Sequence, residues 1–290
     1  MKAPDWRAPV FLPEDDETFV QFLGIGNALN FCFTDPKSGE KFTTEWRGQR
    51  WTGAFGMWAA LRRALENGKG ILDPAKLQSF TAADVARIFE PVPGSPPLPL
   101  IRERAMQLQN VGTVLAQRFG GSFARLFDAC GFEAQKIVET LATFFPAYGC
   151  DRWTHPVTKE QIVFDKRARL LPLMYEGRAR ASESRLSTLR NIERVGPVAD
   201  YEIPRALRHL DVLAYAKPLA KAIDGGILLP SGSEEELAIR HVTCLAMIAL
   251  LHVVNAQRER PITMVELDYA VWSQGRKSNG RHHLTLTTAY

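Results

Sequence analysis

Apolar residues recur every three to four positions along most of this chain, and this helical spacing restricts the fold more than any other feature of the sequence. Met57, Trp58, Leu61 and Leu65 form one such stripe, which ends at Asn67-Gly68, a pair typical of helix C-termini. The same spacing occurs in residues 100–119, 123–127, 137–145, 207–213, 239–251 and 267–272. The pattern predicts a mainly α protein.

Residues with helix-capping chemistry precede several of these stripes. Thr81 with Asp84, and Thr263 with Glu266, have the spacing of a capping box, in which two side chains satisfy the first backbone amides of a helix. Pro204 stands where a first-turn proline belongs. We therefore expect helices to begin at these three places.

The most apolar segment of the chain follows three glutamates, Glu234–Glu236, which favour a helix N-terminus. The helix predicted for residues 239–251 is apolar nearly all round, so we expect it in the centre of the fold. Its longest apolar run, Val242–Val254, has 13 residues, whereas a membrane span needs about 20. We therefore expect no membrane partner.

Strand signals are sparse. Asn30–Phe33 and Lys41–Trp46, joined by the turn residues 35–39, predict a hairpin, and Ile162–Phe164 predicts a short strand. Pro91–Pro99 holds five prolines in nine residues, which indicates an extended connector. We expect a single compact helical domain of residues 1–290 with a small β-hairpin.

Composition excludes several classes of protein. With 46% hydrophobic and 23% charged residues, the chain is neither disordered nor fibrous. The net charge is +4 without a cluster of basic residues, so we expect no obligatory nucleic-acid partner, while an anionic small molecule remains possible. The four cysteines form no CxxC pair and the polar N-terminus is no signal peptide. A cytoplasmic monomer is expected.

Familiar catalytic motifs do not occur in the sequence. There is no Walker loop, HExxH or GxSxG motif, and Gly24-Ile25-Gly26 lacks the third glycine of a dinucleotide site. His282-His283 has no third ligand at metal spacing, so we expect no metal site.

Two carboxylates and one basic pair stand out by position. Asp200 precedes the helix that contains Pro204, where it is either an N-cap or a functional carboxylate. Asp268 lies within an apolar helix face, which makes it part of a buried polar network or a ligand acceptor. Lys166-Arg167 begins a helix after the predicted strand 162–164 and is either a solvated face or an anion site.

Short sequence motifs follow one another in an order that resembles a known family. They include Asn27–Phe33, Phe119–Phe123, Phe145–Tyr148, Lys166–Ala168, Ala199–Tyr201, Glu236–Arg240, Leu267–Tyr269 and the aromatic end at Tyr290. This succession resembles the queuosine salvage protein family, the queuosine 5′-phosphate N-glycosylases, from about Trp6 to Tyr290.

The resemblance implies a fold, a reaction and the residues that perform it. The fold would be similar to that of DNA glycosylases, and the reaction would be metal- and cofactor-free hydrolysis of queuosine 5′-monophosphate to queuine and ribose 5-phosphate. Asp200 would be the catalytic carboxylate. The implied base-binding positions are Val198, Asp268, Tyr269 and Ser273. A 5′-phosphate needs basic donors, and for the phosphate and sugar we expect Lys166, with Arg167, His283 and Tyr290.

The chain departs from the family pattern on the side of the base. Val198 stands where the family usually has phenylalanine, and Ser273 stands where it often has an acid. Asp200 and Asp268 are retained. An alternative is therefore a catalytically altered homologue that binds or cleaves a different 7-deazapurine or purine nucleotide.

Overall fold

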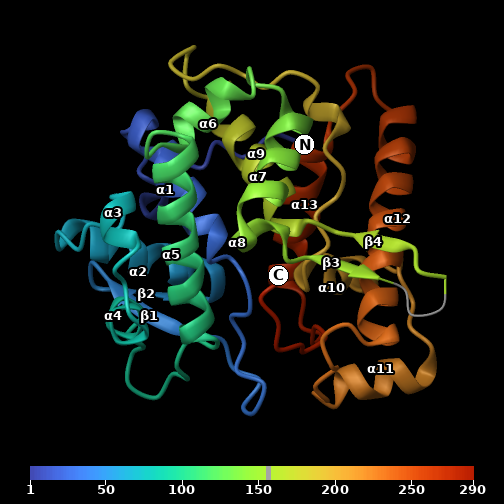
Figure 1. The fold of residues 1–290 in the computed structure, drawn as a ribbon. Coiled ribbons are helices and arrows are strands. Elements are labelled where there is room, and N and C mark those ends of the chain that lie inside the picture. The colour runs from blue at the N-terminus through green and yellow to red at the C-terminus, as the bar shows by residue number, and fades with distance from the viewer. Residues whose placement is uncertain (155–157) are drawn as a thin grey trace.

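Helices form most of the chain in the computed structural model, which describes residues 1–154 and 158–290 (Figure 1). The α-helices are α1 (Asp16–Ala28), α2 (Gly53–Glu66), α3 (Pro74–Leu77), α4 (Ala82–Ile88), α5 (Ile101–Arg118), α6 (Phe123–Ala129), α7 (Ala134–Phe144), α8 (Pro146–Gly149), α9 (Lys166–Arg180), α10 (Glu202–His209), α11 (Lys217–Asp224), α12 (Glu234–Ala256) and α13 (Met264–Lys277). Two short 3₁₀ helices are η1 (Pro9–Phe11) and η2 (Ile192–Arg194). The mainly α prediction is confirmed, while the likeness to DNA glycosylases stays a prediction.

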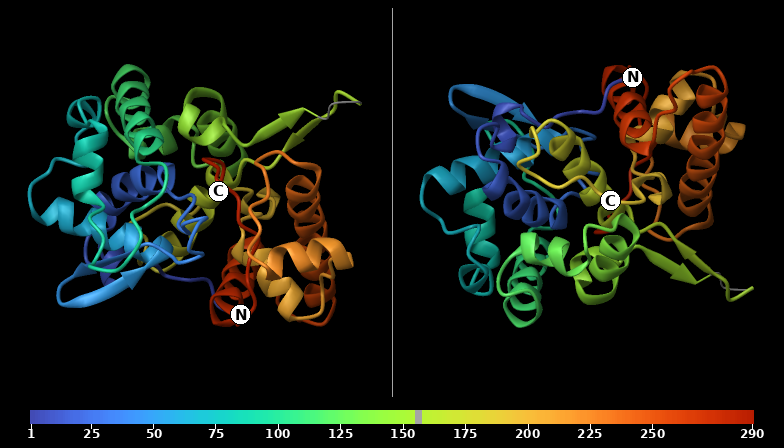
Figure 2. Two further views of the ribbon diagram at one scale, coloured as in Figure 1. Left: turned by 90° about the horizontal axis from the view of Figure 1, so that it is seen from below. Right: turned by 90° about the horizontal axis from the view of Figure 1, so that it is seen from above.

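The strands form two antiparallel pairs. Strand β1 (Thr43–Trp46) pairs with β2 (Gln49–Thr52), and β3 (Arg152–Thr154) pairs with β4 (Gln161–Val163). The β4 strand confirms the expectation of a strand near Ile162. In the two views of Figure 2 the β3–β4 pair projects from the body of the molecule.

The hairpin predicted between residues 30–33 and 41–46 is wrong. Arg47 and Gly48 have φ values of +53° and +71°, which suit a two-residue hairpin turn and pair β1 with the residues that follow it. Residues 30–33 form no strand because the buried guanidinium of Arg104 donates to the carbonyls of Phe31 and Cys32 at 2.5 and 2.9 Å. A single bridge, Thr34 to Lys41, is what remains of the predicted pairing.

The predicted helix starts are present. Thr81 and Thr263 each complete a capping box, with Asp84 and Glu266 as the reciprocal partners. Pro204 is the third residue of α10, inside its first turn. These ends follow from local hydrogen-bonding chemistry, which explains why sequence alone could place them.

The prediction that the apolar helix lies in the centre is wrong. Helix α12 lies at the edge of the molecule (Figures 1 and 2), and Leu245 and Val253 are 53% and 57% exposed. Its other side packs on the body through buried residues such as Ile239, Thr243 and Met247. The helix is apolar all round although only one side of it is covered.

The helices gather into two groups with α7–α9 between them. In both views of Figure 2 the N-terminal helices lie on one side and α10–α13 on the other. One contiguous hydrophobic core runs from Val10 to Tyr290. Helix α1 packs closely within it, because a Cβ at Gly24 or Gly26 would lie 2.3 Å from the Phe123 ring or 1.9 Å from the Trp58 ring. Those glycines therefore serve packing.

The N-terminal segment is held against α9 by one arginine. Arg178 is fully buried and donates to the carbonyls of Asp5, Phe11 and Leu12. Its Nη1 also lies 2.8 Å from Oδ1 of Asp16. This fixes the segment that carries Trp6 against the middle of the molecule.

Candidate active site

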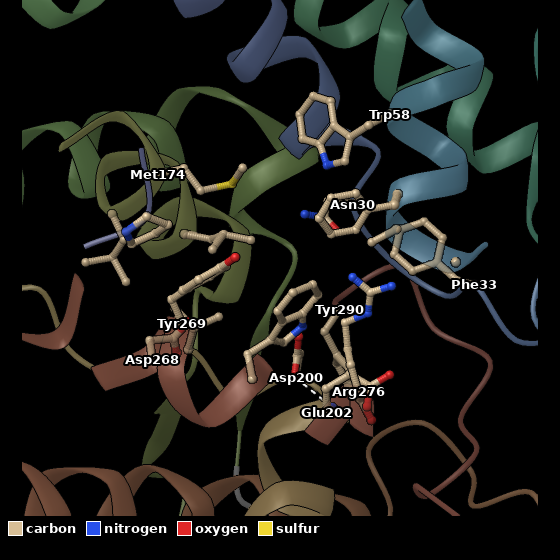
Figure 3. A pocket seen from close by; sticks show the side chains of 18 of the residues that line it. Asn30, Phe33, Trp58, Met174, Asp200, Glu202, Asp268, Tyr269, Arg276 and Tyr290 are labelled. Carbon is tan, nitrogen blue, oxygen red and sulfur yellow. Dashed lines mark hydrogen bonds between the residues drawn. The ribbon is translucent and has the colours of Figure 1, made fainter. Parts of the chain in front are cut away.

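A cavity of about 260 Å³ opens between the two groups of helices (Figure 3). It is lined by α2, α9 and α13, by the segment after α1 and by the loop that leads into α10. The charged lining residues are Lys41, Lys166, Asp200, Glu202, Asp268 and Arg276. The rest of the lining is mainly aromatic and aliphatic, so these charges face a surface of low polarity.

Asp200 lies at the bottom of this cavity, just before α10 (Figure 3). Its Oδ1 accepts the backbone amides of Glu202 and Ile203 at 2.8 and 3.1 Å, so one oxygen caps the helix. The side chain lines the cavity as well, so the capping and the functional interpretation hold together. Burial raises the pKa of Asp200 and nearby Lys166 opposes that rise.

Asp268 enters the same cavity from the first half of α13. It is 8% exposed, and its Oδ1 has no hydrogen-bond partner among the residues that the structure describes. Burial raises the pKa of Asp268 to about 8, with a further contribution from the charge of Asp200. At neutral pH this side chain is therefore largely a neutral carboxylic acid with an oxygen available to a ligand.

Lys166 is the basic residue whose charge lowers the pKa of both Asp200 and Asp268. Its Nζ donates to the carbonyl of Asn30 at 3.1 Å, and the residue is 3% exposed. Burial lowers the pKa of Lys166 to about 8, although the charges of Asp200 and Asp268 favour its protonated form. The three groups thus titrate as one coupled set.

An ion pair forms another part of the cavity wall. Lys41, which follows the loop after α1, pairs with Glu202 of α10, and its ammonium lies 5.5 Å from the centre of the Tyr201 ring. Burial would raise the pKa of Glu202, but Lys41, His282 and Arg205 outweigh it and keep that pKa below its ordinary value. Glu202 is therefore a permanent anion beside Asp200.

A buried ion pair behind the cavity holds Asp200 and Lys166 in place. Arg240 of α12 binds both carboxylate oxygens of Asp151, each at 2.6 Å, and its Nε donates to the carbonyl of Ala199 at 3.1 Å. Asp151 also accepts the backbone amide of Lys166 at 3.0 Å. The ion pair thus binds the backbone amide of Lys166 itself and the carbonyl of Ala199, the residue just before Asp200.

Aromatic rings line much of the cavity beside the carboxylates. Phe55 and Trp272 stack at 6.0 Å, and the Arg276 guanidinium lies 4.6 Å from the centre of the Phe55 ring. Trp6 meets Tyr269 edge to face at 5.3 Å. Flat rings next to hydrogen-bonding groups suit a heteroaromatic ligand.

The structure brings most of the predicted site residues together. Asp200, Val198, Asp268, Tyr269, Lys166 and Tyr290 all line the cavity. Arg167, Ser273 and His283 do not belong to its lining. Arg167 is buried with its guanidinium on the carbonyl of Ala28 and on Sγ of Cys150, and His283 Nε2 lies 3.0 Å from the Tyr290 hydroxyl. Arg167 and His283 are therefore supporting residues outside the cavity lining.

Sequence reasoning missed Lys41, Glu202, Asn30 and Arg276, which also line the cavity. One signal was present for Arg276, because Asp268, Trp272 and Arg276 are spaced by four residues and share a face of α13. Lys41 and Glu202 are far apart in the chain, and only the fold shows that they pair.

Replacement of Asp268 by asparagine is expected to flatten the pH dependence of stability. The folded-state pKa of about 8 exceeds the ordinary 3.8, so the stability that this group contributes is full below pH 3.8 and is lost as the pH rises to about 8. Asp268→Asn removes up to about 1.4 kcal/mol per pH unit from that slope. Urea denaturation between these pH values measures it.

Asp224→Asn is the control for this experiment. The Arg208 side chain lowers the pKa of Asp224, so its contribution to stability is lost only as the pH falls below about 3.8. Its profile should match wild type between pH 5 and pH 8. Parallel curves for Asp268→Asn and wild type would mean that Asp268 is already ionised in the folded protein.

Comparison with known proteins assigns the family. The family model described as queuosine salvage protein matches residues 11–290. A protein of Sphaerobacter thermophilus named queuosine 5′-phosphate N-glycosylase/hydrolase is 31% identical over 99% of this chain and 86% of its own length. Proteins of the same name from Mus musculus and Dictyostelium discoideum are 28% and 27% identical, over 90% and 94% of this chain and 78% and 79% of theirs. The chain therefore belongs to the queuosine salvage protein family.

Proposed function

We propose that this protein hydrolyses the N-glycosidic bond of queuosine 5′-phosphate and releases queuine and ribose 5-phosphate. The observation that carries the proposal is the pair of buried carboxyl groups, Asp200 and Asp268, facing one aromatic cavity in a chain of this family. The names of the relatives supply the substrate and the reaction class.

The free oxygen of Asp200 suits the sugar side of the reaction. Because Oδ1 is occupied by two backbone amides, Oδ2 is the oxygen that can face the anomeric carbon. Departure of the base places positive charge on that carbon, and a fixed carboxylate in a site of low polarity stabilises it. Water supplies the hydroxyl group that completes ribose 5-phosphate, and its proton balances the departing base.

Asp268 suits the base side of the reaction. A 7-deazaguanine base has no ring N7 to protonate, so its developing negative charge must be met at other atoms of the base. A neutral carboxyl group can donate one hydrogen bond and accept another there. Burial and the charge of Asp200 favour this neutral form of Asp268.

Arg276 suits the phosphate group. Among the charged residues of the cavity, Lys41 is paired with Glu202 and Lys166 donates to Asn30. Within residues 1–154 and 158–290, Arg276 has contacts with the rings of Phe55 and Trp272 and no ion pair or hydrogen bond. Its guanidinium donors are therefore available to a dianion that enters beside the rings.

The test is incubation of the purified protein with queuosine 5′-phosphate, queuosine and guanosine 5′-phosphate, with the free base measured by mass spectrometry. Release of queuine, fastest from the phosphorylated substrate, is the expected result. If no queuine is released from either queuosine substrate, the proposal is wrong. Release of guanine alone would favour a homologue altered at the base site, where Val198 lines the cavity.

Arg276→Gln is expected to lower kcat/KM for queuosine 5′-phosphate by about 10- to 100-fold, the range of one lost charge-assisted contact. The value for the nucleoside queuosine should not change, and ribose 5-phosphate should become a weaker inhibitor. Steady-state kinetics with both substrates measures the effect. Lys277→Gln, on the next residue of α13, is the matched control. An equal loss on both substrates would remove Arg276 from the phosphate site.

A further inference from the structure

Helix α12 exposes an apolar face that nothing in the described structure covers. The exposed apolar members of this outer face are Ala238, Val242, Leu245, Ile248, Ala249, Val253 and Ala256, and His241 and His252 are exposed beside them. Val242 and Ile248 are 42% and 43% exposed, and Leu245 and Val253 more than half. A contiguous apolar stripe of this length is uncommon on a protein that stays alone. We propose that the outer face of α12 binds the outer face of α12 in a second copy of this chain, with the two helices antiparallel.

The inner side of α12 is fixed to the body, so the helix presents its outer face as a rigid surface. Arg240 is held by Asp151, and Thr243 and Met247 are fully buried. By length and composition α12 could cross a membrane, since it has 23 residues and an 18-residue stretch of it has a mean hydropathy of 1.9. Insertion of α12 into a membrane would require Arg240 to leave Asp151, and this would break the support of Asp200 described above. The face is therefore available for docking with the helix in place.

Charge at the two ends of the helix favours an antiparallel second copy. Glu234 and Glu235 are exposed at the N-terminus of α12. Arg258 and Arg260 are exposed just beyond its C-terminus, with Glu259 between them. An antiparallel pair brings the acidic end of each helix to the net basic end of the other, whereas a parallel pair would place like ends together.

The spacing of the outer face fits its own copy. Positions 238, 242, 245, 249, 252 and 256 alternate steps of four and three residues, which form a straight seam along a helix, and position 252 is the one histidine in that seam. In an antiparallel pair with its twofold axis near position 247, Leu245 of one copy lies opposite Ala249 of the other. A large side chain then faces a small one on both sides of the axis, as interdigitating helices require.

The alternative occupant, a membrane surface, fits the charges less well. Helices that lie on membranes are rich in Lys and Arg on their polar side. The only cationic residue with a permanent charge within Glu234–Ala256 is Arg240, and it is buried in its ion pair. Its N-terminal end carries the exposed Glu234 and Glu235, which anionic lipids repel, so the exposed charges at its two ends do not form one basic side.

Sedimentation equilibrium of the full chain from about 1 to about 200 µM tests the proposal, a range that brackets the association expected from a single-helix interface. Wild type should self-associate to a dimer. Leu245→Glu should raise the dissociation constant at least tenfold, with an unchanged circular dichroism spectrum. Met106→Glu, at a 59% exposed methionine of α5, is the matched control and should leave the dimer intact.

Charge reversal tests the orientation. The pair Glu234→Arg and Glu235→Arg should weaken the dimer, as should Arg258→Glu with Arg260→Glu, and the four changes together should restore it. A protein that is monomeric throughout, or a dimer that Leu245→Glu does not affect, overturns the proposal. So does binding of the wild type, but not of Leu245→Glu, to vesicles of phosphatidylcholine and phosphatidylserine, because that assigns the face to a membrane.

Discussion

Asp200→Asn is expected to lower kcat for queuosine 5′-phosphate on the order of 10²- to 10⁴-fold, with little change in KM. The amide retains the size of the carboxyl group, and its oxygen can still accept the amides of Glu202 and Ile203. What it loses is the negative charge that stabilises the anomeric centre. Single-turnover release of queuine, followed by mass spectrometry, measures this step separately from product release.

The same substitution should leave stability unchanged or raise it at neutral pH. Burial raises the pKa of Asp200, so folding opposes its ionisation and the neutral amide avoids that cost. A lower rate in a more stable protein separates a catalytic role from a structural one. Glu176→Gln, at a buried carboxylate of α9 outside the cavity, should leave the rate near that of wild type. Undiminished hydrolysis by Asp200→Asn would contradict its catalytic role.

Asp151→Ala is expected to reduce the free energy of unfolding by about 3–5 kcal/mol. The change leaves the guanidinium of Arg240 buried without its two carboxylate contacts, and it also removes the acceptor for the backbone amide of Lys166. Hydrolysis should fall as well, because Arg240 holds the carbonyl next to Asp200. Urea denaturation at neutral pH measures the loss of stability.

Two further variants test whether burial of the Asp151–Arg240 pair causes this large loss of stability. Asp224→Ala removes a carboxylate with the same two-pronged contact to Arg208, at 2.7 and 2.8 Å, on a side chain that is 53% exposed. Its cost should be about 1 kcal/mol or less. Asp151→Ala combined with Arg240→Met should recover part of the lost stability because no charge is left buried. Equal costs at Asp151 and Asp224 would contradict this account.

The features that sequence could predict depend on neighbouring residues. Helix stripes, the capping boxes at Thr81 and Thr263 and the strand near Ile162 follow from local spacing and hydrogen bonding. Asp200 and Asp268 were predicted from their positions and from the family resemblance, and the structure places both at one cavity. Their chemical roles stay predictions until activity is measured.

The features that sequence could not predict depend on distant residues. The carbonyls of Leu29, Phe31 and Cys32 are bound by Arg104, more than 70 positions away, so a segment with strand composition forms no strand. Burial of Arg167 on the carbonyl of Ala28 turned a predicted phosphate ligand into a supporting residue. The pattern of α12 gave its hydrophobicity, but hydrophobicity alone does not say whether the body of the protein covers the helix.

Trp6 and Tyr290 line the same cavity although they are 284 positions apart in the chain. Contacts between residues so distant form late, because the chain must close a large loop before they stabilise anything. During synthesis, the helices of the N-terminal group can pack while the ribosome is still adding the residues of α13. This cavity is therefore the last part of the molecule to be completed, and a ligand that fills it would slow unfolding more than it speeds folding.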